Sequence, residues 1–356
     1  IMPSLVGSEM CIRDRLSSLT LAACQNDQNP NESGQEENSQ VEDSQEEMNQ
    51  DQASQTEDSG ADQEDEEGEE GQADGDQGQL EVTDPLGHQV SLPSDPERLA
   101  VFDNGQLDIL QDLGLADRVV ATATDNLPDH LQEFADLPVA GTLHEIDLEI
   151  ANAEEPDLAI VARRSSDNYD AVSQVAPTLD MSDADGDLWA SIQENLSLYG
   201  EIFNLEDEAS AIESDLEASL SDLQEQNEAS DLSTLVLMTN EGALSAFGSG
   251  SRYSFVHDLF GFEPVDTGIE ASRHGMDVSY EYVVDQNPDL IFVIDRTAAI
   301  GGDQEAGEFS DNPLIQETDA YQNDNIVYLT PDVWYLSEGG TQALAQMIEE
   351  VSVVFD

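Results

Sequence analysis

The sequence predicts an α/β fold in which two lobes are joined by one long helix. Two series of short apolar strands alternate with helices, over residues 80–204 and 230–356, as is typical of open α/β sheets. Between them, residues 205–229 contain no glycine or proline and repeat apolar side chains every three or four positions. This repeat indicates an amphipathic helix about 35 Å long. We expect the ligand cleft to lie between the two lobes.

The first lobe is predicted to open with a hairpin, because the apolar segments 80–82 and 90–92 flank the turn sequence 84–87. Helices are expected at 106–113, where Gly114 ends the apolar spacing, and at 148–153, before Pro156. Apolar runs predict buried strands at 98–102, 119–122, 137–140 and 157–161.

The second lobe repeats this alternation. One helix is expected at 253–260, and apolar runs predict strands at 234–238, 244–247, 289–294 and 325–329. The two lobes are therefore expected to be of the same α/β kind.

Positive charge is nearly absent from the chain. There is no lysine, and nine arginines face 80 Asp and Glu residues, for a formal net charge of −71. Such a surface repels itself in dilute buffer, but the Debye length falls to about 3 Å in 1 M salt. The composition is typical of a halophile's protein, and its acidity argues against nucleic acid as a partner.

The N-terminal segment is predicted to carry an export and anchoring signal. Leu21-Ala22-Ala23-Cys24 has the form of a lipobox at the end of an apolar segment, so residues 1–24 are interpreted as a truncated signal with lipidation at Cys24. Residues 1–15 resemble read-through of a sequencing adapter and are set aside. The acidic, almost wholly polar stretch 25–79 is expected to be a disordered linker. The lipid would be the sole membrane anchor of an extracytoplasmic protein, at the cell surface or in the periplasm.

Five of the nine arginines fall in loops at or near the ends of predicted strands: Arg163, Arg164, Arg252, Arg273 and Arg296. Open α/β sheets bind ligands beyond the carboxyl ends of their strands. One arginine alone would most simply pair with a nearby carboxylate. Several together, each with a fixed charge and a planar fork of donors, suit a multiply charged oxyanion or chelate.

Five short segments resemble the substrate-binding lipoproteins of ferric-siderophore ABC importers, in particular the subgroup that takes catecholate siderophores of the petrobactin type. The resemblance runs from about residue 80 to 350, and its segments are VFD (101–103), DNLP (125–128), AFGSGSR (246–252), FVIDR (292–296) and WYLS (334–337). It implies the class III periplasmic-binding-protein architecture, with two lobes bridged by one helix. It also implies capture of an anionic ferric siderophore for iron uptake, with no catalytic activity and no cofactor.

The resemblance assigns specific residues to the cleft. Three arginines hold the chelate in that family, and the matching positions are Arg164, Arg252 and Arg296. Arg163 and Arg273 depart from the subgroup and would make the pocket more basic.

Other cleft positions follow from the same resemblance. Asn126 lies in a matching segment, and Trp334 and Tyr335, with Tyr253, are expected to supply aromatic walls. In some members a histidine and a tyrosine complete the coordination of iron, and His274 and Tyr335 match them. For these two residues we predict pocket lining rather than direct iron ligation.

The resemblance also implies partners. Family members dock on their permease through one acidic residue per lobe, and Glu149 and Glu281 occupy the matching places. The expected partners are a ferric siderophore, an ABC permease and its ATPase, with the receptor itself a monomer.

Two alternatives stay open. The same fold could bind haem or a corrinoid, with His274 or Tyr335 as axial ligand. A secreted metal-dependent hydrolase could instead use the acidic loop around Asp183 and Asp185. That loop has the acidic spacing of an EF-hand, but Leu188 stands where the calcium loop needs glycine. The histidines show no close metal-ligand spacing, which disfavours a receptor for bare metal ions.

Overall fold

The computed structural model describes residues 78–123, 126–183, 186–302 and 309–355. The predicted lipidation site Cys24 and nearly all of the predicted linker lie outside these residues, as do Asp125 and Asp185. Together the described residues form one compact unit.

The first lobe begins with the hairpin of β1 (Gln79–Thr83) and β2 (Gln89–Pro93), as predicted. A parallel sheet follows in the order β4-β3-β5-β6, and its strands are β3 (Leu99–Val101), β4 (Val119–Thr122), β5 (Leu158–Val161) and β6 (Thr178–Asp180). The helices of this lobe are α1 (Asn104–Asp112), α2 (Leu148–Ala153), α3 (Tyr169–Val172) and α4 (Leu188–Phe203). The residues of β3 and β5 are buried throughout, as expected of parallel strands that helices cover on both faces.

The second lobe contains a mixed sheet in the order β10-β8-β7-β11-β12, with β9 (Glu263–Pro264) beside β7. Its other strands are β7 (Ser233–Asn240), β8 (Ala243–Phe247), β10 (Met276–Val278), β11 (Leu290–Asp295) and β12 (Ile326–Leu329). The helices after β8 are α6 (Phe255–Asp258), α7 (Tyr280–Gln286), α8 (Arg296–Ala299), α9 (Asp319–Gln322), α10 (Pro331–Leu336) and α11 (Thr341–Ser352).

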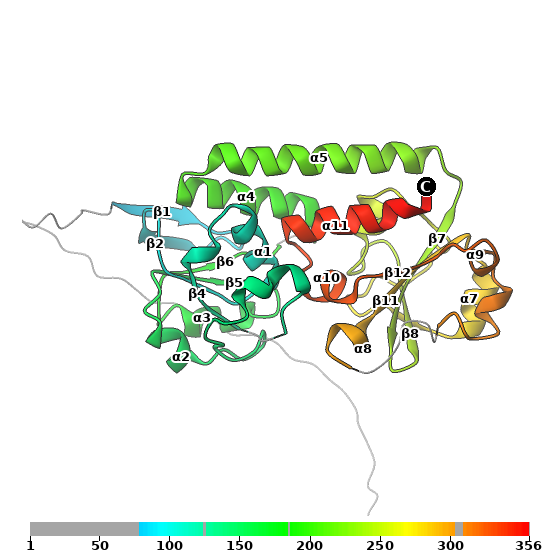
Figure 1. The fold of residues 1–356 in the computed structure, drawn as a ribbon, viewed down its shortest axis with the longest axis horizontal. Helices are drawn as coiled ribbons and strands as arrows, with labels where there is room; N and C mark the ends of the chain where they lie inside the picture. Colours follow the sequence, from blue (N-terminus) through cyan, green and yellow to red (C-terminus); the bar gives the residue numbers. More distant parts are fainter. Residues whose placement is uncertain (1–77, 124–125, 184–185, 303–308, 356) are drawn as a thin grey trace, which may run out of the picture. The chain divides into compact units, whose positions relative to one another are not determined.

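The long helix α5 (Glu206–Glu228) connects the two sheets and lies alongside α4 and α11 (Figure 1). Its buried residues are Ala209, Leu216, Leu220 and Leu223, which belong to the predicted apolar stripe. Three acidic residues occupy the first turn, where their negative charges interact favourably with the positive end of the helix dipole. The predicted α/β sheets and the connecting helix are confirmed.

The C-terminal helix α11 is fixed to the first lobe by a carboxylate from another helix. No side chain of its own N-cap, Gly340, can cap it. The buried Asp108 of α1 accepts hydrogen bonds from the backbone N–H groups of Gln342 at 2.8 Å and Ala343 at 2.9 Å. A β-carbon at Gly340 would lie 2.4 Å from the Asp108 carboxyl carbon, so this close approach requires glycine.

Two predicted elements are wrong in detail. Residues 137–140 do not form a strand, and only an isolated bridge joins Val139 to Thr122, because Pro138 has no N–H group to donate. The predicted helix 253–260 shortens to α6, because several of its backbone hydrogen bonds span three residues in tight turns. The helices α4 and α11 were not predicted.

Candidate functional site

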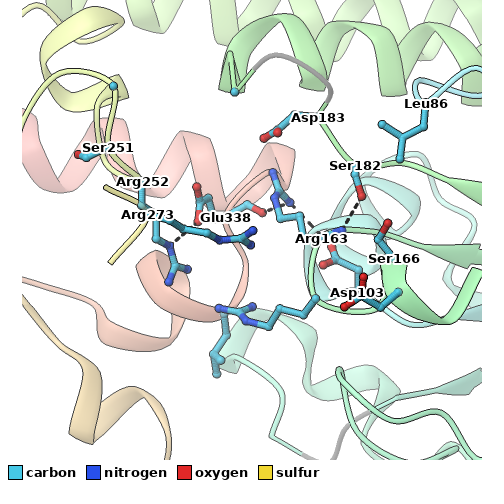
Figure 2. Close-up of a pocket in the computed structure, with 15 residues that line it drawn as sticks. Leu86, Asp103, Arg163, Ser166, Ser182, Asp183, Ser251, Arg252, Arg273 and Glu338 are labelled. Atoms are coloured by element: carbon cyan, nitrogen blue, oxygen red, sulfur yellow. Dashed lines mark hydrogen bonds and ion pairs between the residues drawn. The ribbon is translucent and has the colours of Figure 1, made fainter. Parts of the chain in front are cut away.

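A cavity of about 420 Å³ lies where loops of the two sheets meet the end of α10 (Figure 2). Its lining combines four arginines with carboxylates and hydroxyls, and the residues are Leu86, Asp103, Arg163, Arg164, Ser166, Asp167, Ser182, Asp183, Gly186, Gly250, Ser251, Arg252, Arg273, Leu336 and Glu338. Four of the five arginines singled out in the sequence therefore share one cavity.

The first lobe contributes Arg163 and Arg164, which follow β5 within two or three residues. Arg163 has a φ of 49°, in the left-handed region, and its backbone N–H donates to Ser182 Oγ at 2.7 Å. This conformation costs a non-glycine residue about 1 kcal/mol or more. The Arg163 guanidinium donates to the backbone carbonyl of Glu338 and lies 4.0 Å from Asp103 Oδ1. The loop thus directs its guanidinium toward the segment after α10.

The second lobe contributes Arg252 and Arg273. Arg252 lies in the loop between β8 and α6, and its Nε donates to Glu338 Oε2 at 2.8 Å. Arg273 is exposed, and its guanidinium makes no hydrogen bond or ion pair with the described residues. Figure 2 shows Arg163, Arg252 and Arg273 around Glu338.

Tyr335 is the contact point of three arginines. Its backbone carbonyl, at the C-terminal end of α10, accepts hydrogen bonds from Arg164 Nη2 at 2.7 Å and Arg252 Nη2 at 2.8 Å. Its phenolic oxygen accepts from Arg296 Nε at 2.9 Å. The guanidinium carbons of Arg164, Arg252 and Arg296 lie 5.2, 4.5 and 5.5 Å from the centre of its ring, which is cation–π range. One aromatic residue therefore holds arginines of both lobes together.

The pKa shifts follow from this concentration of charge. Burial alone would raise the pKa of the Tyr335 phenol, but the hydrogen bond and charge of Arg296, with the charges of Arg252 and Arg164, outweigh it and lower the pKa below its ordinary value. Burial, followed by repulsion from Arg252, lowers the pKa of Arg164. Burial opposes the charge of Arg252 as well, but Glu338 outweighs it and raises that pKa. The four arginines of the cavity lining, here called the arginine cluster, thus concentrate positive charge, and Glu338 offsets part of it at Arg252.

Asp103 forms part of the cavity wall from the N-terminus of α1, where its carboxylate caps the helix by accepting from Gln106 N at 3.2 Å. Burial raises the pKa of Asp103, and the charges of Arg163 and Arg164 counter this only in part.

The prediction that Trp334 and Tyr253 form aromatic walls of the pocket is wrong. Both side chains are fully buried, and neither lines the cavity. Trp334 stacks on Phe255, with ring centres 5.7 Å apart, and its Nε1 donates to Glu350 at 2.8 Å. Successive residues of a helix point in different directions, so the side of α10 that presents Tyr335 to the arginines turns Trp334 into the core.

Four other predicted residues lie outside the cavity lining, and one of them is Tyr335, which contacts the cavity arginines instead. Arg296 reaches the cluster only through Tyr335 and also donates to Asn240 Oδ1 at 3.0 Å. Asn126 donates to the backbone carbonyl of Ala299 at 3.2 Å and so joins the first lobe to α8. His274 is exposed beside Arg273. Their ligand-binding roles stay predictions.

The two acidic residues expected to dock on a permease occupy equivalent positions in the two lobes. Glu149 and Glu281 are exposed, each at the second residue of a short helix, after the N-caps Asp147 and Ser279. The pKa of Glu281 is lowered by its own backbone N–H and by Ser279. Both carboxylates are therefore accessible at the surface.

Glu338 is the main site residue that the sequence did not reveal. In a chain with 80 acidic residues, one more glutamate carries no signal. The pair Gly339-Gly340 after it could have drawn attention to the segment. A β-carbon at Gly339 would lie 2.1 Å from Arg163 Nη2, so glycine is required for the arginine to pass.

The acidic loop of the hydrolase alternative does reach the cavity, through Asp183. Within the described residues, no three His, Cys, Asp or Glu side chains are grouped so as to hold a metal ion. Among the described residues, no helix has both the length and the apolarity needed to cross a membrane.

Comparison with known proteins identifies the family. A family model described as periplasmic binding protein matches residues 99–333. The petrobactin-binding protein YclQ of Bacillus subtilis is 38% identical over 262 residues, which are 73% of this chain and 83% of that protein. Its crystal structure matches with a TM-score of 0.76 at 36% identity, and the match covers 78% of this chain and 99% of the crystallised YclQ chain.

Two further relatives agree with this match. The ferric-anguibactin-binding protein FatB of Vibrio anguillarum is 30% identical over 271 residues, 74% of this chain and 84% of FatB. The structure of the catecholate-siderophore-binding protein VctP of Vibrio cholerae gives a TM-score of 0.72 at 30% identity, and the match covers 78% of this chain and 100% of the VctP chain in that structure. The chain belongs to the periplasmic binding protein family, and its fold is the predicted class III arrangement of two α/β lobes joined by a long helix.

Proposed function

We propose that this protein captures an anionic ferric siderophore of the catecholate, petrobactin-like type outside the cytoplasm and delivers it to an ABC importer. The family consists of extracytoplasmic substrate-binding proteins, and the relatives YclQ, FatB and VctP are named for siderophores. The observation that carries the proposal is the gathering of four of the chain's nine arginines around one cavity, with a fifth joined to them through Tyr335.

The arginine cluster suits this ligand chemically. A ferric catecholate complex presents several anionic oxygens around one metal, and guanidinium groups stay charged and donate in fixed directions. Two of these guanidiniums are largely withdrawn from water, since the side chains of Arg163 and Arg252 are 12% and 15% exposed. In such surroundings an added anion is screened less by salt than it would be at the surface. The site can therefore select an anion even in brine.

Because both lobes contribute arginines to the cavity, a bound ligand could draw the two lobes together. Arg164 of the first lobe and Arg252 of the second donate to the same carbonyl of Tyr335. A ligand that engages both guanidiniums would draw the lobes together, and the single helix α5 would keep that movement modest.

Delivery would use the surface and the N-terminal segment. The exposed carboxylates Glu149 and Glu281, one on each lobe, are proposed to dock on the permease of an importer driven by an ATPase. Lipidation at Cys24 is proposed to tether the receptor to the membrane, with no direct metal ligand or cofactor in the protein itself.

The proposal is tested by titrating the full chain in molar salt with a ferric tris-catecholate, a neutral ferric hydroxamate and haem, while tryptophan fluorescence is recorded. We expect saturable quenching at sub-micromolar ferric catecholate and at least about tenfold weaker binding of the hydroxamate, because only the anionic chelate gains from the arginines. Preferential binding of haem, visible as a Soret band, would contradict the proposal, as would equal affinity for the charged and the neutral chelate.

A further inference from the structure

Glu338 places a negative charge inside the cavity proposed to bind an anion. Its carboxylate accepts from Arg252 Nε at 2.8 Å, and its side chain is 17% exposed. It lies in the segment between α10 and α11, shortly after Tyr335, the contact point of the arginines at the end of α10. An anion that approaches Arg252 therefore meets a carboxylate already bound there.

The cavity as a whole is balanced in formal charge. The lining contains four arginines and four carboxyl groups, Asp103, Asp167, Asp183 and Glu338. Of these four, Glu338 forms an ion pair with Arg252, and Asp103 lies at the 4.0 Å limit of an ion pair with Arg163. Asp103 is also the N-cap of α1 and is fixed by the helix. Among the four lining carboxyl groups, Glu338 thus pairs closely with an arginine and does not cap a helix.

The side chain and the backbone of Glu338 are held by different arginines. Arg163 holds the backbone carbonyl of Glu338, and the described residues offer its carboxylate one hydrogen bond, from Arg252. Rotation of the side chain would break that bond and leave the loop anchored. Arg252 would keep its second bond, from Nη2 to the Tyr335 carbonyl at 2.8 Å.

We propose that Glu338 is a resident counter-ion that competes with the ligand for Arg252. It stabilises the arginine cluster when the cavity is empty, and a strongly anionic chelate must displace it. The carboxylate thereby sets a threshold of ligand charge, since a neutral chelate gains too little from Arg252 to replace an ion pair. This inference rests on the proposed function and adds to it a residue that determines specificity.

The test compares Glu338→Gln with the full-length parent protein, both titrated with ferric tris-catecholate and neutral ferric hydroxamate in molar salt. Glutamine keeps the size of the side chain and removes its charge. We expect the ferric catecholate to bind about tenfold more tightly, because it no longer competes with the charged hydrogen bond between Glu338 and Arg252. The affinity for the hydroxamate should change by less than about twofold. Glu338→Ala should change affinity in the same direction, and the thermal midpoint of each variant shows that it is folded.

The matched control is Glu349→Gln, which removes one charge from an exposed position of α11. It should leave both affinities unchanged. If the parent binds the catecholate and Glu338→Gln binds it equally or more weakly, the competition is disproved while the proposed function stands. If Glu349→Gln matches the gain of Glu338→Gln, a general charge effect replaces the inference. If neither the parent nor Glu338→Gln binds the ferric catecholate, both the inference and the proposed function are overturned.

Discussion

Replacement of Arg252 by glutamine should weaken ferric-catecholate binding at least about 100-fold, or ~3 kcal/mol. The variant loses a largely buried guanidinium that donates to both Glu338 and Tyr335. It also leaves the Glu338 carboxylate unpaired in the cavity, where it repels an anionic chelate. The loss should therefore exceed that of a single contact, and Glu338→Gln in the same chain should restore part of it. Fluorescence titration in molar salt measures both effects.

The control for Arg252→Gln is Arg98→Gln. Arg98 is 44% exposed at its side chain and contacts Glu154 in the first lobe, outside the cavity. Its replacement removes the same formal charge from the protein. Equal losses in the two variants would mean that overall charge, and not the arginine cluster, determines affinity.

Replacement of Asp108 by alanine should destabilise the protein by about 3 kcal/mol or more and lower the melting temperature by roughly 10 °C. The carboxylate is fully buried and caps α11 through the N–H groups of Gln342 and Ala343. It also contacts His130 Nε2 at 2.9 Å. Alanine leaves these donors without their partner, and the first turn of α11 keeps only its other contacts with α1, among them the hydrogen bond from Thr341 to Asp112. Thermal unfolding followed by circular dichroism in molar salt measures the change.

Glu349→Ala serves as the control for Asp108→Ala, because it removes an exposed carboxylate from the same helix α11. It should shift the midpoint by no more than about 2 °C. A midpoint of Asp108→Ala within that range would show that the capping contact contributes little to stability.

The fold was largely predictable because its signals are local. In the apolar runs of β5 and β11 and in the helical repeat of α5, burial can be predicted from residues that are close together in the sequence. The helix α11 has such a repeat as well and was missed, whereas its cap could not be predicted in this way. Asp108 and Gln342 are 234 positions apart, and a contact over that separation leaves no periodic pattern in the sequence.

The basic residues of the site could be predicted because positive charge is rare in this chain, and the acidic ones could not because negative charge is common. With so few basic residues in the chain, Arg163, Arg164, Arg252 and Arg273 could be singled out, and the structure brings them to one cavity. Glu338 could not be distinguished among 80 acidic residues.

The prediction for Trp334 of α10 failed for a different reason. Adjacent aromatic residues at 334 and 335 suggest one surface, but a helix directs one into the core and the other toward the arginines. The direction of a side chain on a short helix depends on tertiary packing, which the sequence of that helix does not contain.

The most direct test of the account is the position of iron in crystals of the protein with ferric tris-catecholate, located by anomalous scattering at the iron absorption edge. We predict one iron peak inside the cavity, beside the Tyr335 ring and within reach of chelate oxygens bound to Arg164 and Arg252. An iron peak elsewhere on the protein, with the arginine cluster unchanged and Glu338 still paired to Arg252, would contradict the central claim.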